Sequence, residues 1–232
     1  MVAYRSSSVT TVASRTNTGA TAPTGIVDGD ALFLFVTVAL ATPPAVTPPT
    51  GFSLLPNFPI SSASSGSIIV AASAYVKIAS GESGNYTVTH ATAYSQVYMA
   101  AFSAPNTATP FSPNPTVNTG TGTTTTMLGL TTTTDNSVVM TIDADWGDTS
   151  NALTPPSGTT PTFTERADQA PAIEVADGTL AIAGATGNKT MTNNSLAADP
   201  WLGFMFALPR ASTFRASKPY TKLQAVNRSY TY

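Results

Sequence analysis

Apolar and polar residues alternate along much of this chain, and no stretch keeps the i, i+3, i+4, i+7 spacing of an amphipathic helix. Proline (18 residues) and glycine (16 residues) interrupt the alternation at short intervals. This pattern predicts an all-β fold, either a sandwich or a barrel. The predicted strands cover 7–14, 31–40, 67–78, 86–90, 95–104, 123–130, 137–146, 161–166, 173–183, 189–192 and 201–208.

Several short sequences occur twice, at nearly constant separations. Three pairs lie 107 positions apart: TPP at 47 and 154, Gly51 and Gly158, and Asp28 and Asp135. GNYTVT at 84–89 and GNKTMT at 187–192 lie 103 positions apart. The recurrence predicts an internal duplication, about 28–105 and 135–209, within one domain at 1–210. Because a half with one apolar face cannot bury that face alone, the two copies are expected to pack as a jelly-roll-like β-sandwich.

The repeated TPP-G stretch has a structural explanation. Proline cannot donate a hydrogen bond to a strand ladder, and glycine provides the backbone freedom of a turn. We therefore interpret 47–51 and 154–158 as equivalent corners of the fold rather than as a functional motif.

The two copies differ in one row of side chains. In the second copy Asp143 and Asp145 alternate with apolar residues, which predicts a strand with one solvent-exposed face. The corresponding row of the first copy is entirely apolar, so it should be covered by the N-terminal segment, by another layer of strands or by a neighbouring subunit. This covered or oligomer-forming row consists of Leu32, Leu34, Val36 and Val38.

The composition narrows the class of protein. Charged residues make up 9% of the chain, against about 25% in average proteins. The surface is therefore expected to be rich in Thr and Ser, as in extracellular or virion β-proteins. Cysteine is absent, which excludes disulfides and thiolate chemistry. No signal peptide is recognisable at the N-terminus, and no apolar run is long enough to cross a membrane.

Charge is divided unevenly between the body and the C-terminal end. Residues 1–209 hold five basic and twelve acidic residues, a formal charge of −7, whereas 210–232 holds five basic residues and no acid. Such a division predicts a basic arm at 211–232 that contacts a partner. Its aromatic residues are expected to anchor it and its basic residues to steer docking. These partner-binding residues are Phe214, Arg215, Lys218, Tyr220, Lys222, Arg228, Tyr230 and Tyr232.

Candidate catalytic and metal-binding residues are few. Asp143, Asp145 and Asp148 could supply oxygen ligands for Ca²⁺ or a carboxylate pair for glycoside hydrolysis, but their spacing is not that of an EF-hand loop. His90 is the only histidine, so zinc binding and a Ser-His-Asp triad are disfavoured, and we interpret it as a hydrogen-bonded residue at a strand end. We expect no enzyme activity, no metal and no cofactor.

Aromatic residues provide a second kind of candidate site. Trp146, Tyr75, Tyr94 and Tyr98 could stack on sugar rings, but aromatic residues at strand positions more often belong to the core. A carbohydrate-binding role would require them to line an exposed groove.

Four stretches carry a resemblance to a known group of proteins. IVDGDALFLFVTVAL with VTPPTGFSLL, AYVKIASGESGNYTVT, FTERADQ, and VADGTLAIAGATGNKTMT resemble β-sandwich virion proteins of tailed bacteriophages. The resemblance covers about 26–209 and does not extend to the basic arm. Such domains occur in head decoration proteins, tail proteins and adhesins, so the resemblance implies this type of domain without specifying its role, and it brings no catalytic residues.

The sequence therefore predicts a structural protein of a phage particle. The leading expectation is a capsid cement or decoration protein, made in the host cytoplasm and placed on the particle surface. Its expected partners are the major capsid protein or another virion protein and further copies of itself, as a trimer or dimer, without nucleic acid or membrane. The alternatives are a tail-associated adhesin or carbohydrate-binding module, and a glycan hydrolase.

Overall fold

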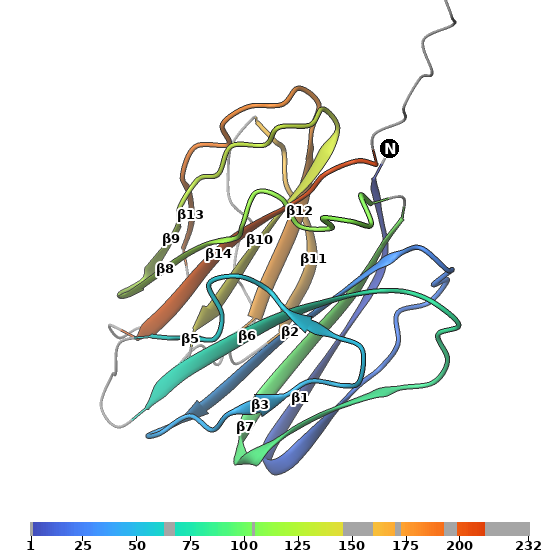
Figure 1. Cartoon of the computed structure of the whole chain (residues 1–232). Coiled ribbons are helices and arrows are strands. Elements are labelled where there is room, and N and C mark those ends of the chain that lie inside the picture. The colour runs from blue at the N-terminus through green and yellow to red at the C-terminus, as the bar shows by residue number, and fades with distance from the viewer. Residues whose placement is uncertain are drawn as a thin grey trace, which may run out of the picture.

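Two antiparallel sheets pack face to face in the computed structural model, which describes residues 2–62, 68–103, 105–145, 160–169, 173–192 and 199–211 (Figure 1). The described part of the chain is all β, as predicted, and none of it forms a helix that could cross a membrane.

The first half of the chain forms the first sheet, in which β7 and β6 flank β2. Its strands are β1 (Ala3–Ala20), β2 (Ala31–Leu40), β3 (Val46–Thr47), β4 (Ser53–Leu54), β5 (Ile60–Ser61), β6 (Ile69–Ile78) and β7 (Tyr86–Ser103).

The second half forms the second sheet, in which β12 and β14 flank β10. A short two-stranded ladder of β9 and β13 lies beside it. The strands of this half are β8 (Thr116–Thr121), β9 (Thr124–Met127), β10 (Ser137–Asp145), β11 (Thr164–Gln169), β12 (Ile173–Leu180), β13 (Lys189–Thr192) and β14 (Pro200–Leu208).

The main core lies between the two sheets and is rich in aromatic rings. Phe33 of β2 meets Phe206 of β14 with ring centroids 5.0 Å apart, and Phe35 meets Phe204 at 5.1 Å. Edge-to-face geometry of this kind is favourable because the positive edge of one ring faces the negative face of another. These contacts join the central strand of the first sheet to β14 of the second.

The outer face of the first sheet carries a second core. Leu32, Leu34 and Val36 are fully buried there and Val38 is nearly so, which confirms that this row is covered. The cover comes from the chain itself, through residues such as Phe52, and the row is therefore not free to form an oligomer contact. The N-terminal half of β7 and the segment after β1 also contribute to this cluster.

The outer face of the second sheet is covered as well. Met127 of β9 and Met191 of β13 pack there with Val139 of β10. Asp143 and Asp145 are both fully buried, so the prediction that they are exposed is wrong. The alternation of acidic and apolar residues along β10 indicated a solvent-exposed face. That local pattern contains no information about the β9–β13 ladder, which packs on the outer side of this sheet.

The two sheets have the same strand order. The first runs β1-β7-β2-β6-β4, and the second, read in the same sense, runs β8-β14-β10-β12-β11. In each sheet the strand that begins the half lies at one edge, and the next long strand occupies the centre. The segment between the two predicted copies, 106–134, therefore contains β8 and β9 in the positions that β1 occupies in the first half.

Matching turns accompany this order. Asp28 Oδ1 accepts a hydrogen bond from Gly81 N at 2.7 Å, and Asp135 Oδ1 accepts one from Ala183 N at 2.8 Å. The residue after each aspartate has positive φ, 89° in the first half and 56° in the second. Both aspartates thus fasten the start of a central strand to the turn that leaves its neighbour.

Strand register also agrees with the sequence offsets. Ala20 pairs with Tyr86, and Met127 pairs with Lys189. These pairs are related by the separations of 107 and 103 positions found in the sequence. The second TPP-G stretch, 154–158, lies outside the described residues.

Candidate functional site

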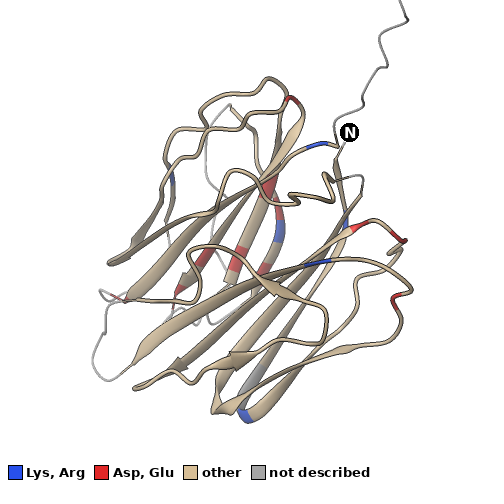
Figure 2. Cartoon of the chain, in the orientation of Figure 1, with Lys and Arg blue, Asp and Glu red and all other residues tan. Residues whose placement is uncertain are grey.

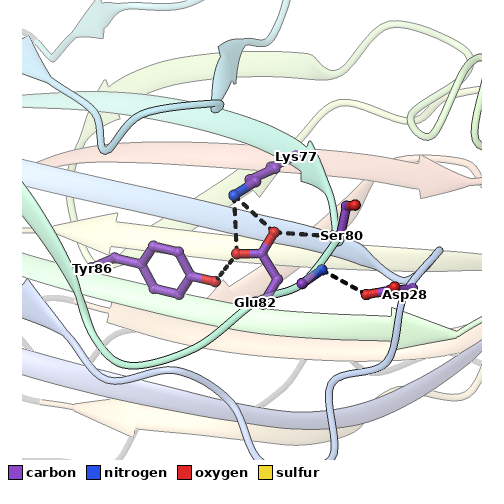
Figure 3. Close-up of polar contacts among 6 residues, drawn as sticks. Asp28, Lys77, Ser80, Glu82 and Tyr86 are labelled. Carbon is purple, nitrogen blue, oxygen red and sulfur yellow. Dashed lines mark hydrogen bonds and ion pairs between the residues drawn. The ribbon is translucent and has the colours of Figure 1, made fainter.

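A polar cluster lies at one end of the first sheet, where the segments 26–40 and 74–89 meet (Figure 3). We call Lys77, Glu82 and Tyr86 the clasp. Glu82 accepts hydrogen bonds from Lys77 at 2.9 Å and from Tyr86 at 2.5 Å, and from the Ser80 backbone N–H at 3.1 Å. The Asp28 bond to Gly81 joins the same turn. The clasp thus ties the end of β6 to the start of β7.

Electrostatics strengthen the clasp. Burial alone would raise the pKa of Glu82, but the hydrogen bonds from Lys77, Tyr86 and Ser80 outweigh it and hold the pKa below its usual value. Burial, followed by the hydrogen bond to Glu82 and by the charge of Glu82, raises the pKa of the Tyr86 phenol. Glu82 is therefore ionised and Tyr86 is neutral at physiological pH. The contribution of Glu82 to stability is present above the pKa of an unfolded glutamate and is lost as the pH falls through the lower pKa of the folded state.

The clasp also fixes the first TPP-G corner. Gly51 has φ of 89°, and Phe52 N donates to Pro49 O at 3.3 Å, as in a turn that needs glycine at its third position. A Cβ on Gly51 would lie 3.1 Å from Cε of Lys77. Phe52 then packs edge-to-face on Tyr86, with ring centroids 5.6 Å apart. The corner and the clasp are one structural unit.

We predict that Glu82→Gln destabilises the protein by about 1–2 kcal/mol, because it replaces charge-assisted hydrogen bonds with neutral ones. Thermal unfolding at pH 7 measures the change. Lys77→Met should cost a similar amount, and the double variant should cost less than the two single changes together, by about 1 kcal/mol. Strictly additive losses would contradict a clasp that acts as a unit.

A second polar contact closes the edge of the sandwich. Arg166 of β11 forms an ion pair with Asp177 of β12 at 2.7 Å, and its guanidinium carbon lies 4.2 Å from the ring centroid of Tyr4 in β1. Ser7 Oγ donates to the Arg166 carbonyl at 3.5 Å. Arg166 belongs to the FTERADQ stretch, so this stretch also serves the fold.

His90 lies in a chain of buried hydrogen bonds. Its Nδ1 donates a hydrogen bond to the Ala91 carbonyl at 2.8 Å. Nε2 lies 3.3 Å from Thr18 Oγ1, which lies 2.5 Å from Ser95 Oγ. Because His90 and both hydroxyls are buried, the arrangement is structural rather than that of a reactive nucleophile.

The aromatic candidates do not form an exposed platform among the described residues. Tyr75 and Tyr98 are buried, and Tyr94 is half-buried. Burial raises the pKa of the Tyr98 phenol. Trp146 lies outside the described residues. The large hydrophobic side chains that are exposed in the described ranges are aliphatic: Val27, Leu40, Leu54, Leu128 and Ile182.

One pocket of about 380 Å³ opens on the outer side of the first sheet. Its floor contains Val38 and Ser73, and its walls include Pro44 and Leu54. No charged side chain and no amide lines it. Its polar side chains are those of Ser61, Ser73 and Tyr75.

Several acidic residues lie on neighbouring strands of the second sheet (Figure 2). Asp143 of β10 and Asp168 of β11 both lie directly opposite Glu174 of β12. Sequence reasoning had singled out Asp143 and Asp145 but not Glu174, because strand pairing was needed to bring it beside them. Among the described residues no group of three acidic or histidine side chains is arranged to hold a metal ion. Asp148 lies outside the described residues.

The predicted arm residues also lie outside the described residues, which end at 211. The last described contact is a β-bridge between Arg210 and Pro105. The arm therefore begins at the end of the sandwich where the first half of the chain finishes.

Comparison with protein-family models, with curated proteins and with solved structures gave no match.

Proposed function

We propose that this chain is a structural protein of a bacteriophage particle, a cement or decoration protein that binds the head and stabilises it. Supporting this proposal, the stretches that resemble phage β-sandwich proteins are used to build a rigid body. Asp28, Lys77 and Glu82 fasten turns, and Arg166 closes an edge between the sheets. Such a body is suited to a structural role in a particle.

We further propose that the body arose by internal duplication. The equal strand order, the paired aspartate turns and the conserved offsets in register support this origin. The jelly-roll likeness stays a prediction of the sequence. Since each half supplies the strands of one sheet, duplication followed by face-to-face packing is the simpler account of the sandwich.

The charge division between body and arm carries the proposal of a docking role. Residues 1–209 have a formal charge of −7, and the basic residues after them are not accompanied by any acid. A basic arm with aromatic anchors can lie along the major capsid protein, another virion protein or a sister subunit, with rim carboxylates as partners. Many copies on a shell, as trimers or dimers, would add their weak contacts into avidity. The proposed location is the surface of the phage particle.

We predict that removing 211–232 leaves the melting temperature unchanged but abolishes binding to particles or the oligomeric state. The body should keep its stability because its cores consist of described residues between Val2 and Leu208. Co-sedimentation with particles that lack the protein measures binding, and light scattering measures the oligomeric state. Normal binding by the truncated protein would exclude the arm as the docking element.

Point variants separate charge from shape. Replacing Arg215, Lys218, Lys222 and Arg228 by Ser should weaken binding by about 10- to 100-fold and reduce its salt dependence. The matched control replaces the uncharged arm residues Thr221, Gln224 and Asn227 by Ser and should bind normally. Equal losses in both variants would contradict steering by charge.

A further inference from the structure

A row of carboxylates crosses three neighbouring strands of the second sheet. Asp143 of β10 pairs with Glu174 of β12, and Glu174 pairs with Asp168 of β11. Residues directly opposite in antiparallel strands share one face, with Cβ atoms about 4.5–5.5 Å apart. The three carboxyl groups therefore stand side by side, with Glu174 in the middle.

The middle of this row is shielded from water. Glu174 and Asp143 are fully buried, whereas Asp168 is half-buried and Glu165, beside it on β11, is exposed. Among the described residues, neither carboxylate oxygen of Glu174 has a hydrogen-bond partner. An ionised carboxylate in this position would lack the partners that normally compensate burial.

The three strands that carry this row, β10, β11 and β12, contain one basic residue, Arg166. Between 143 and 199 the only basic residues are Arg166 and Lys189. Arg166 forms its ion pair with Asp177, which lies opposite the core residue Met140 and so faces the interior of the sandwich. Lys189 donates to the Thr160 carbonyl. Adjacent like charges in a sheet are destabilising, and more so when buried.

We propose that the row is a proton-binding site, in which Glu174 is a neutral carboxylic acid at neutral pH and its ionisation under alkaline conditions loosens the second sheet. The electrostatics agree with the geometry. Burial, followed by the charges of Glu165, Asp168 and Asp143, raises the pKa of Glu174 to about 9. This inference does not rest on the proposed docking function.

The sign of the effect follows from the raised pKa. The folded protein holds a proton on Glu174 up to about pH 9, whereas the unfolded chain releases it near pH 4.5. Stability from this proton is complete below the unfolded value and is lost as the pH rises through the folded value. A conventional acid, with its pKa lowered by folding, would give the opposite slope.

The first test compares the melting temperature of the wild type with that of Glu174→Gln between pH 6.5 and pH 9.5. The wild type should lose about 5–10 °C over this range relative to the variant. Glutamine keeps the shape of the neutral acid and cannot ionise. The control Glu165→Gln, at an exposed position, should keep most of the pH dependence and reduce it only in part. An unchanged slope in Glu174→Gln would overturn the proposal.

The second test observes the proton directly. The chain has three glutamates, Glu82, Glu165 and Glu174, so carboxyl-¹³C glutamate gives three resonances that Glu82→Gln and Glu165→Gln assign by elimination. The Glu174 carboxyl should titrate near pH 9, even if Glu174→Gln does not fold. Titration near pH 4–5 would overturn the proposal. A rise in melting temperature on adding Ca²⁺ in the wild type, lost in Glu174→Gln, would also overturn it by showing that a cation occupies the row.

Discussion

Leu34→Asp should prevent the chain from folding. Leu34 is fully buried in the outer core of the first sheet, between Tyr75 of β6 and Met99 of β7. A carboxylate there would have no partner, and an uncompensated buried charge costs several kcal/mol. A typical domain has a free energy of unfolding of only about 5–15 kcal/mol, so this one substitution would remove much of the stability of the protein. Circular dichroism and thermal unfolding of the purified variant measure the loss.

Three companion variants identify the cause. Leu34→Asn introduces a side chain of the same size as aspartate but without its charge, so it should destabilise the protein less than Leu34→Asp. Leu34→Ala should cost about 2–5 kcal/mol because of the cavity that it leaves. Thr87→Asp adds the same charge at an exposed position of β7 and should melt within a few degrees of the wild type. If Leu34→Asp melts like Thr87→Asp, the outer face of the first sheet is open to water and the assignment of a second core is incorrect.

Phe204→Ala should lower the stability by about 3–5 kcal/mol and the melting temperature by about 10 °C. Phe204 is fully buried between the sheets. Its ring centroid lies 5.1 Å from that of Phe35 and 5.3 Å from that of Phe58. Alanine would remove contacts to both rings, and the space left between the two sheets could not close unless the sheets moved together.

A matched variant in the other core tests this explanation. Phe52→Ala also removes a ring, but Phe52 lies at the border of the outer cluster with 9% of its surface exposed, so it should cost about half as much. Chemical denaturation provides the free energies. If Phe52→Ala and Phe204→Ala destabilise the protein equally, the core between the two sheets does not contribute more to stability than the outer cluster.

Strand positions could be predicted where the alternation of residues was strong. The predicted bounds 31–40 and 189–192 are those of β2 and β13. The prediction placed a break at 91–94, but β7 is continuous because no glycine or proline interrupts it there. Its pairing with β1 instead shifts register around Ala93. A local pattern detects the residues that suit a strand, and a bulge that leaves the strand intact has no comparable signal.

The failures of prediction involve contacts between distant segments. β8 was missed because TVNTGT has little apolar character of its own, and its place in the sheet depends on Gly120. A Cβ at Gly120 would lie 2.3 Å from the ring of Trp201, so glycine is needed to seat that ring. Likewise, Asp143 belongs to a buried row only because β12 and β11 bring Glu174 and Asp168 beside it. Neither relation can be found without knowing which strands pair.

The pairing of β1 with β7 affects how the chain folds while it is being translated. Ala3 lies opposite Ser103. The N-terminal end of β1 can therefore pair with β7 only after about a hundred further residues have been synthesised. Until β14 follows, the rings of β2 have no opposing sheet to cover them. Such long-range closure is slow and leaves apolar surface exposed during synthesis. The nascent chain is thus expected to depend on chaperones for nearly its whole length, and the yield of folded protein should fall when translation is fast or the temperature is high.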